Sequence, residues 1–171
     1  MAASGEPRKS SGSVTDRRSA YLDALHLLAR RELSVAECRA RLAGKDHPQD
    51  EIDVAIEHLL ETGALDDRRV ARAFVRTALN VKGRGRLRIQ RELQEKGISR
   101  EIVADTLAEA FGDTDERALV ARAIQKRLRG RTTLKDRAES ARLYQYLMRQ
   151  GYTPAAVVAA LRKIRGGREE D

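Results

Sequence analysis

The chain has 171 residues, of which 41% are apolar and 35% are charged, a balance typical of a folded soluble protein with one domain or a few small units. Its formal net charge of +8 predicts attraction to nucleic acid or to an acidic protein surface. Aromatic residues make up only 4% and tryptophan is absent, which argues against a surface that works mainly by stacking on bases.

Cysteine content and hydropathy exclude further classes. Cys38 is the only cysteine, so an internal disulfide and a thiolate zinc site are excluded. No apolar run approaches the roughly 20 residues that span a bilayer, and the first residues lack the apolar segment of a secretory signal. We therefore expect a cytoplasmic protein without membrane contact. The opening is rich in Ser, Gly, Pro and Arg, which predicts a mobile arm over residues 1–18.

From Tyr21 onward, apolar residues recur at three and four positions and period-two alternation is almost absent, which predicts an all-α fold. Helix starts are marked by Ser34 with Glu37, by Asp66 or Asp67, and by Thr153 before Pro154. Helix ends are marked by Gly63, Gly97, Gly130 and Gly151. We expect helices over residues 19–30, 35–43, 49–62, 68–79, 86–96, 100–111, 116–129, 137–149 and 154–164.

The sequence also repeats itself at a period of about fifty residues, which signals stacked helical units. Aligning Leu93 with Leu147 brings ELQEKGISREIVADTL onto YLMRQGYTPAAVVAAL without gaps, with the two turn glycines in register. The first copy, aligned on Leu42, keeps the apolar positions but has Asp46 in place of the glycine.

Each copy predicts three helices, and helices of about twelve residues are marginal in water unless they bury their apolar stripe against neighbours. We therefore expect an elongated array of three tandem three-helix repeats with a continuous but thin core. The expected boundaries are an arm at 1–18, repeats at 19–63, 64–112 and 113–166, and a tail at 167–171.

The stretch KGRGRLRIQRELQEKGIS, which begins at Lys82, carries five cations in its first ten residues and no acid among them. Like charge accumulated in this way is unfavourable without a partner, so one interpretation is contact with phosphates or acidic protein groups. The alternative is a flexible connector and a solvated helix start, in which Arg88 with Glu92 and Arg91 with Glu95 pair at four-residue spacing. We favour contact, and we expect these arginines to be exposed.

A second set of cations follows in LVARAIQKRLRG, where Val120, Ile124 and Leu128 share one helix face and basic residues the opposite face. A solvated basic face explains this set equally well. The two basic sets lie in adjacent repeats, so stacking can place them along one surface. The candidate contact residues are Lys82, Arg84, Arg86, Arg88, Arg91, Arg122, Lys126, Arg129, Arg131 and Lys135.

Other patterns predict no chemistry. Gly83 and Gly85 follow no strand and precede no Walker lysine, so a hinge is favoured over a nucleotide loop. His26, His47 and His58 lack further ligands at metal spacing and are interpreted as surface or turn residues.

The remaining candidates are structural or non-catalytic. Tyr152 occupies a packing position of the repeat, whereas Tyr146 is the better candidate for an exposed ring, and Cys38 is interpreted as a small core residue. Because no serine or cysteine nucleophile with a nearby histidine stands out, we expect neither enzymatic activity nor a cofactor.

The repeated segments resemble the RecX family, bacterial regulators of the RecA recombinase. The resemblance runs from about Ala24 to Leu161 and rests on LARRELSVAECRARL, LLETGALDDRRVARAFV, KGRGRLRIQRELQEKGIS and YQYLMRQGYTPAAVVAAL in the order and spacing of the family. The sequence departs from the family pattern at Asp46 and His47, and in the entry to the third unit, GRTTLKDRAES, which has no matching glycine-rich loop.

The resemblance implies tandem three-helix repeats that bind the RecA filament on single- or double-stranded DNA and mainly inhibit its ATPase, strand exchange and SOS activity, without being an enzyme. A monomer is the simplest expectation. A different class remains open: a helix-turn-helix module that docks a recognition helix in the major groove and acts through DNA alone.

Overall fold

The computed structural model describes residues 19–112 and 114–166, and over these residues the chain forms nine α-helices and no strand. The helices are α1 (Ala20–Leu28), α2 (Val35–Ala43), α3 (Gln49–Glu61), α4 (Asp67–Asn80), α5 (Arg86–Glu95), α6 (Arg100–Phe111), α7 (Glu116–Leu128), α8 (Arg137–Gln150) and α9 (Pro154–Gly166). The all-α prediction is confirmed, with each helix within a few residues of its expected bounds. The expected arm and tail lie outside the described residues.

Local signals in the sequence begin and end these helices. Ser34 and Glu37 form the predicted capping box of α2, and the Asp66 carboxylate accepts the first amides of α4. The four glycines predicted to end helices all have positive φ. Asp46, which stands at the glycine position of the first repeat, also adopts the left-handed conformation with φ 62°.

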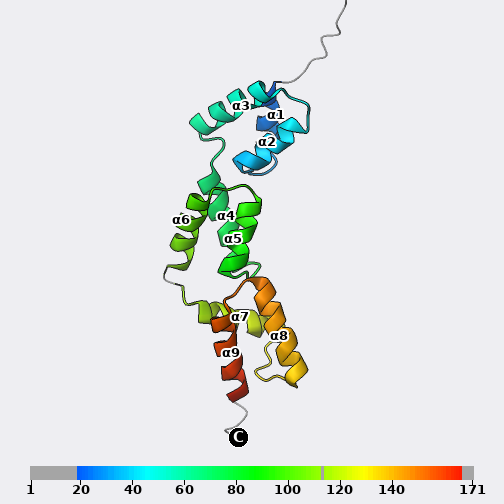
Figure 1. The fold of residues 1–171 in the computed structure, drawn as a ribbon, viewed down its shortest axis with the longest axis vertical. Coiled ribbons are helices and arrows are strands. Elements are labelled where there is room, and N and C mark those ends of the chain that lie inside the picture. Colours follow the sequence, from blue (N-terminus) through cyan, green and yellow to red (C-terminus); the bar gives the residue numbers. More distant parts are fainter. Residues whose placement is uncertain (1–18, 113, 167–171) are drawn as a thin grey trace, which may run out of the picture.

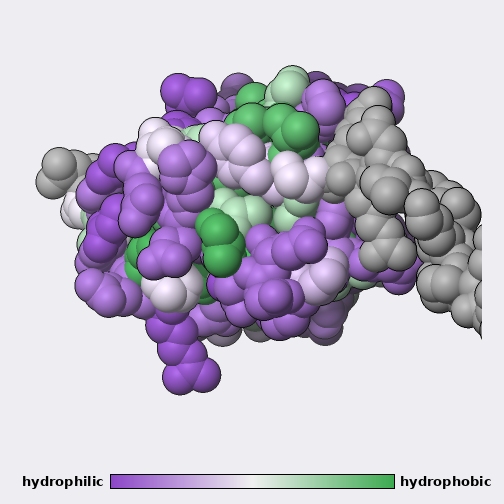
Figure 2. All heavy atoms as spheres, turned by 90° about the horizontal axis from the view of Figure 1, so that it is seen from above, coloured by the Kyte–Doolittle hydropathy of each residue, from purple (hydrophilic) through white to green (hydrophobic). Residues whose placement is uncertain are grey.

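The helices are arranged as three successive three-helix units in an elongated array (Figure 1). In each unit the first and third helices pack together, α1 with α3, α4 with α6 and α7 with α9, while the second helix closes the bundle. Seen down the long axis from the end formed by the first unit, hydrophilic residues cover most of the surface around smaller apolar areas (Figure 2).

The core is not continuous, which corrects the prediction. The buried apolar residues of the first unit form one cluster, and those of the second and third units form a second, shared cluster. The first joint is polar: the Ser34 hydroxyl donates to the Lys96 carbonyl, Lys96 Nζ lies 3.0 Å from Glu37, and the Val35 amide donates to Asp67. Polar groups at this joint separate the two apolar clusters.

Both joints use equivalent positions of the repeat. In each, the start of the second helix of one unit meets the turn after the second helix of the next unit. At the first joint, Gly97 faces Ala36; at the second, the Gly85 amide donates to the Gln150 carbonyl at 2.7 Å and the Leu87 amide to the Gly151 carbonyl at 3.1 Å. The same positions of the sequence repeat therefore form the contacts between successive units.

Glycine is required at the second joint by close backbone approach. A Cβ at position 85 would lie 2.4 Å from the Gly151 carbonyl oxygen, and a Cβ at position 151 would lie 2.3 Å from the Arg88 amide nitrogen. The sequence favoured a hinge at Gly83 and Gly85. That interpretation is wrong for Gly85, which is buried against the third unit.

Candidate interaction surface at the second joint

The loop between α4 and α5 is held in place by the third unit. Besides the two backbone hydrogen bonds of the joint, the Tyr152 hydroxyl donates to the Gly83 carbonyl at 2.9 Å; within the second unit, the Arg84 amide donates to the Ala78 carbonyl of α4 at 2.9 Å. Burial raises the pKa of Tyr152 to about 12, so this phenol remains a donor at neutral pH. Lys82 therefore projects from a loop with a fixed backbone.

Cations of α7 reach the same loop. Lys126 Nζ lies 3.4 Å from the Val81 carbonyl oxygen, and Arg122 is close enough to Tyr152 to favour the ionised phenolate and oppose the rise in its pKa. Because Arg122 lies one turn before Lys126 on the same face of α7, the exposed residues Lys82, Arg122 and Lys126 lie near one loop. We call the surface formed by these three cations the joint surface.

Two of the candidate contact residues form ion pairs at the joint. Arg84 and Arg88 both pair with Glu92, and Arg88 also donates to the Arg149 carbonyl at 3.3 Å. The Arg84 side chain is only 17% exposed and that of Glu92 19%. The expectation that the arginines of this stretch are exposed is therefore wrong for Arg84, because Glu92 neutralises it inside the joint.

The other cations of the first set remain exposed. Arg86, the first residue of α5, lies with its guanidinium carbon 5.8 Å from the centre of the Phe111 ring, a cation–π contact. Lys82 and Arg91 are exposed and make no ion pair with the residues that the structure describes.

The second set of cations likewise contains exposed residues and a residue held in an ion pair. The structure confirms that Val120, Ile124 and Leu128 are buried while Arg122, Lys126 and Arg129 are exposed on the opposite side of α7. Arg129 ends the helix in the left-handed conformation with φ 54°. Arg131 pairs with Glu139 at 2.6 Å, and Glu139 also accepts the Lys135 amide. Lys135 itself is exposed.

Sequence reasoning missed the apolar part of this surface. Val81 is 65% exposed and Leu87 is 45% exposed, although both belong to the large apolar residues that proteins usually bury. They flank Lys82 and Arg86 in the chain. The repeat contained a signal for this exposed apolar residue: Leu87 aligns with Ala36, so a large side chain stands where the first joint has a small one.

Other predicted roles are resolved by the packing. Cys38 and Tyr152 belong to the core as expected. Tyr146 is half-buried, with Arg127 5.1 Å from its ring centre, so its ring is not open for stacking. His47 lies in a turn but is not a surface residue, since its side chain is 8% exposed and its Nε2 is 2.9 Å from Asp23.

The described residues offer no cluster of three or more His, Cys, Asp or Glu side chains that could hold a metal ion. Among the same residues, no helix is long and apolar enough to span a bilayer. The chemistry available at the joint surface is recognition through cations beside exposed apolar groups.

Comparison with known proteins gives a consistent result. Two family models match, "RecX, first three-helix domain" over residues 20–59 and "RecX, second three-helix domain" over residues 66–107. The chain is 36% identical over 137 residues to Regulatory protein RecX of Halorhodospira halophila, covering 80% of this chain and 83% of that protein. It is 34% identical to Regulatory protein RecX of Vibrio parahaemolyticus, covering 76% and 81%.

Solved structures show the same fold. The crystal structure of RecX from Lactobacillus salivarius matches with a TM-score of 0.68 over 85% of this chain and 94% of that chain, at 21% sequence identity. A second structure, of a regulatory protein RecX, matches with a TM-score of 0.71 over 82% and 70%.

Proposed function

The chain belongs to the RecX family, and from this premise we propose that it binds the RecA filament on DNA and restrains its ATP hydrolysis and strand exchange, thereby limiting recombination and the SOS response. It acts by binding rather than by catalysis, in the cytoplasm, as a monomer. The joint surface is the part of the molecule that contacts the filament, together with the exposed residues Arg86, Arg91, Arg129 and Lys135.

One observation carries this proposal. Lys82, Arg122 and Lys126 come from different units yet gather around a loop that Tyr152 and Gly85 hold in place. A rigid set of cations loses little conformational freedom on binding, and this favours contact with a regular polyanionic partner. The elongated array can lie along such a partner and contact more than one of its subunits (Figure 1).

Arg84, Arg88 and Arg131 have a different role in the proposal. Because Arg84 and Arg88 share the Glu92 carboxylate and Arg131 pairs with Glu139, they hold the joint and the entry to α8 rather than meeting the filament. Their replacement would disturb binding through the fold, which separates them from the exposed cations.

The competing function is a DNA-binding module of helix-turn-helix type. The exposed Val81 and Leu87 favour a protein partner, because apolar side chains beside cations match a protein interface better than a phosphate backbone. For a module that neutralised about five duplex phosphates, affinity would fall as the salt concentration rises, with a slope of about −4.5 in log K against log salt concentration. Filament binding need not follow that slope.

The test is a titration of RecA's DNA-dependent ATPase with this protein, with and without excess competitor DNA. We expect inhibition at concentrations too low to coat the free DNA, and little loss of inhibition when competitor is added. Loss of inhibition in proportion to the competitor would instead identify DNA sequestration as the activity.

A further inference from the structure

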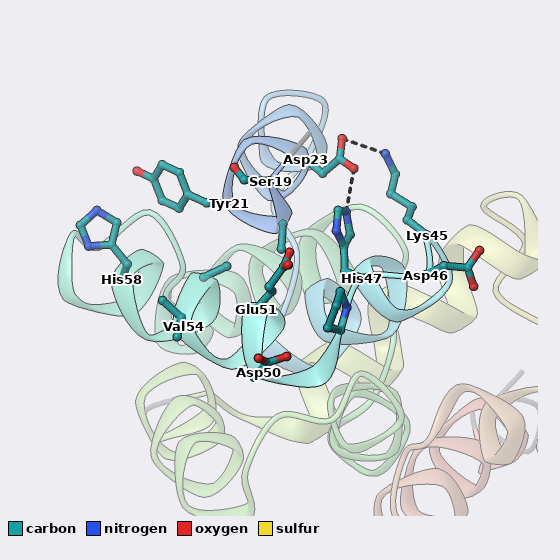
Figure 3. A pocket seen from close by; sticks show the side chains of 13 residues that line it. Ser19, Tyr21, Asp23, Lys45, Asp46, His47, Asp50, Glu51, Val54 and His58 are labelled. Atoms are coloured by element: carbon teal, nitrogen blue, oxygen red, sulfur yellow. Dashed lines mark hydrogen bonds and ion pairs between the residues drawn. The ribbon is translucent and has the colours of Figure 1, made fainter. Parts of the chain in front are cut away.

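Each unit has a groove between its first and third helices. The pairs of side chains that lie across this groove differ from unit to unit. In the second unit, two ion pairs join α4 to α6: Arg68 with Asp105 at 2.9 Å and Arg72 with Glu109 through two contacts of 3.1 and 3.2 Å. In the first unit, the Tyr21 and His58 rings occupy the positions of Arg72 and Glu109, with centres 5.0 Å apart (Figure 3).

The third unit lacks both closures. When α7 is aligned on α4 by their N-cap residues, Asp115 on Asp66, and α9 on α6 by the repeat, Arg117 and Ala159 stand at the positions of the first ion pair, and Ala121 and Lys163 at the positions of the second. One member of each pair has become alanine, once on α9 and once on α7. Two cations therefore remain in the groove without an opposing carboxylate: Arg117, whose counterpart Arg68 has Asp105, and Lys163, which stands at the position of Glu109 and faces Ala121.

The groove of the third unit is larger than that of the second. It has a volume of about 720 Å³, compared with about 280 Å³ for the closed groove of the second unit. Ile124, Ala160 and Ile164 give it an apolar floor between Arg117 and Lys163. Of the remaining charged side chains that line it, Arg131 is paired with Glu139, and Asp115 caps α7 by accepting the Arg117 amide.

The groove of the first unit has the opposite chemistry. Its volume is about 800 Å³, but Asp23, Asp46, Asp50 and Glu51 line it, and the Tyr21 and His58 rings lie together at one side of it (Figure 3). Only the third groove among the described residues combines an apolar floor with cations that face alanine across the groove.

We propose that the groove between α7 and α9 binds an acidic, amphipathic helical segment of a partner protein, whose carboxylates take the places left by the two alanines, Ala159 opposite Arg117 and Ala121 opposite Lys163. Carboxylates four residues apart on one helix face meet Arg117 and Lys163, and apolar side chains of the same face meet Ile124 and Ile164. A protein segment is favoured over nucleic acid because phosphates leave an apolar floor unfilled. The proposal does not rest on filament binding by the joint surface, which uses another side of α7.

The test uses a fluorescein-labelled synthetic helix with glutamates at four-residue spacing flanked by leucines, followed by fluorescence anisotropy. The decisive variant is A121E with A159D, which supplies each groove cation with an internal acid and rebuilds the closure of the second unit. The control is A104E with A141D, which adds the same two charges at exposed helical positions outside the groove.

We expect the closed variant to bind the peptide about tenfold more weakly or worse, while the control binds within about twofold of the wild type. Circular dichroism should show both variants folded, and the closed variant should be at least as stable as the wild type. A peptide with alanine in place of leucine should also lose binding.

Several outcomes would overturn the proposal. Equal loss in the closed and control variants would show that net charge alone attracts the peptide. Full displacement by single-stranded DNA, with parallel loss of DNA binding in the closed variant, would assign the groove to nucleic acid. Self-association of the wild type that the closed variant abolishes would make a second copy the occupant. Binding about tenfold tighter by a chain that ends at Gly166 would assign the groove to the chain's own acidic terminus.

Discussion

Replacing Gly85 by alanine should separate the second and third units. The Gly85 backbone has φ −81°, so alanine adds no conformational strain there, but its Cβ would lie 2.4 Å from the Gly151 carbonyl oxygen. Backbone cannot yield as a flexible side chain does, so the joint must open.

The magnitude follows from the bonds that the opening removes. The hydrogen bonds nearest the clash run from Gly85 to Gln150, from Leu87 to Gly151 and from Tyr152 to Gly83; Arg88 and Lys126 donate further hydrogen bonds across the joint. At about 0.5–1.5 kcal/mol net for each, loss of the first three lowers the free energy of unfolding by about 1.5–4.5 kcal/mol. Exposure of shared core residues adds to this loss.

Urea unfolding followed by circular dichroism measures the effect, with Gly63→Ala as the matched control. Gly63 has φ 69° and nothing within 4 Å of an added Cβ, so alanine there brings only left-handed strain of about 1–2 kcal/mol. We expect Gly85→Ala to split the transition, as third-unit unfolding uncouples from the rest. A single transition with a free energy of unfolding within about 0.5 kcal/mol of the wild type would refute the reasoning.

Three further predictions concern single side chains. Glu92→Gln leaves Arg84 and Arg88 without their counter-charge and should lower the free energy of unfolding in urea by about 1–2 kcal/mol, whereas the exposed Glu95→Gln should change it by less than about 0.5 kcal/mol. Asp46→Gly removes left-handed strain and, after the larger conformational entropy of glycine in the unfolded chain is subtracted, should raise the free energy of unfolding by up to about 1 kcal/mol. A thermal unfolding midpoint below that of the wild type would contradict the assignment of strain to Asp46. Hydrogen bonds from Arg131 and the Lys135 amide lower the pKa of Glu139 from 4.5 to about 2. The contribution of Glu139 to stability is therefore present above pH 4.5 and is lost as the pH falls towards 2. Carbon-detected NMR titration of Glu139 should show a pKa of about 2, and Arg131→Ala should raise this pKa.

The sequence was sufficient to predict the helices because local chemistry decides them. Ser34, Asp66 and the turn glycines act within a few residues, and the apolar stripe of α7 is visible in Val120, Ile124 and Leu128. The repeat extended this information to the number of units, because aligned positions such as Leu93 and Leu147 are buried alike.

The pairing of charges could not be predicted in the same way. Arg84 and Glu92 are eight residues apart and meet only because the loop folds back on α5, so local spacing gave no signal. The convergence of Lys82 and Lys126 depends on how the third unit docks, which Tyr152 and Gly151 determine across the joint. The exposure of Val81 likewise depends on tertiary packing.

His47 shows how a departure from the repeat is accommodated. It occupies the position of Ile98 and Tyr152, which are core residues, and it is buried as they are. Burial of an imidazole requires a polar partner, and Asp23 provides it; hydrogen bonds from His47 and Lys45 in turn lower the pKa of Asp23. From the sequence, His47 is interpreted as a surface or turn residue; the structure shows it buried at a core position of the repeat, with Asp23 as its compensating carboxylate.

The most direct measurement of the central claim compares two triple variants as inhibitors of RecA's ATPase on single-stranded DNA. One variant removes the joint surface (K82A, R122A, K126A), and the other removes three exposed cations elsewhere, on the first and second units (R30A, R41A, R100A). We predict that the first needs about tenfold more protein, or more, for half-inhibition, while the second stays within about twofold of the wild type. Equal weakening of both variants would contradict the account, because general positive charge would then explain the inhibition without a joint surface.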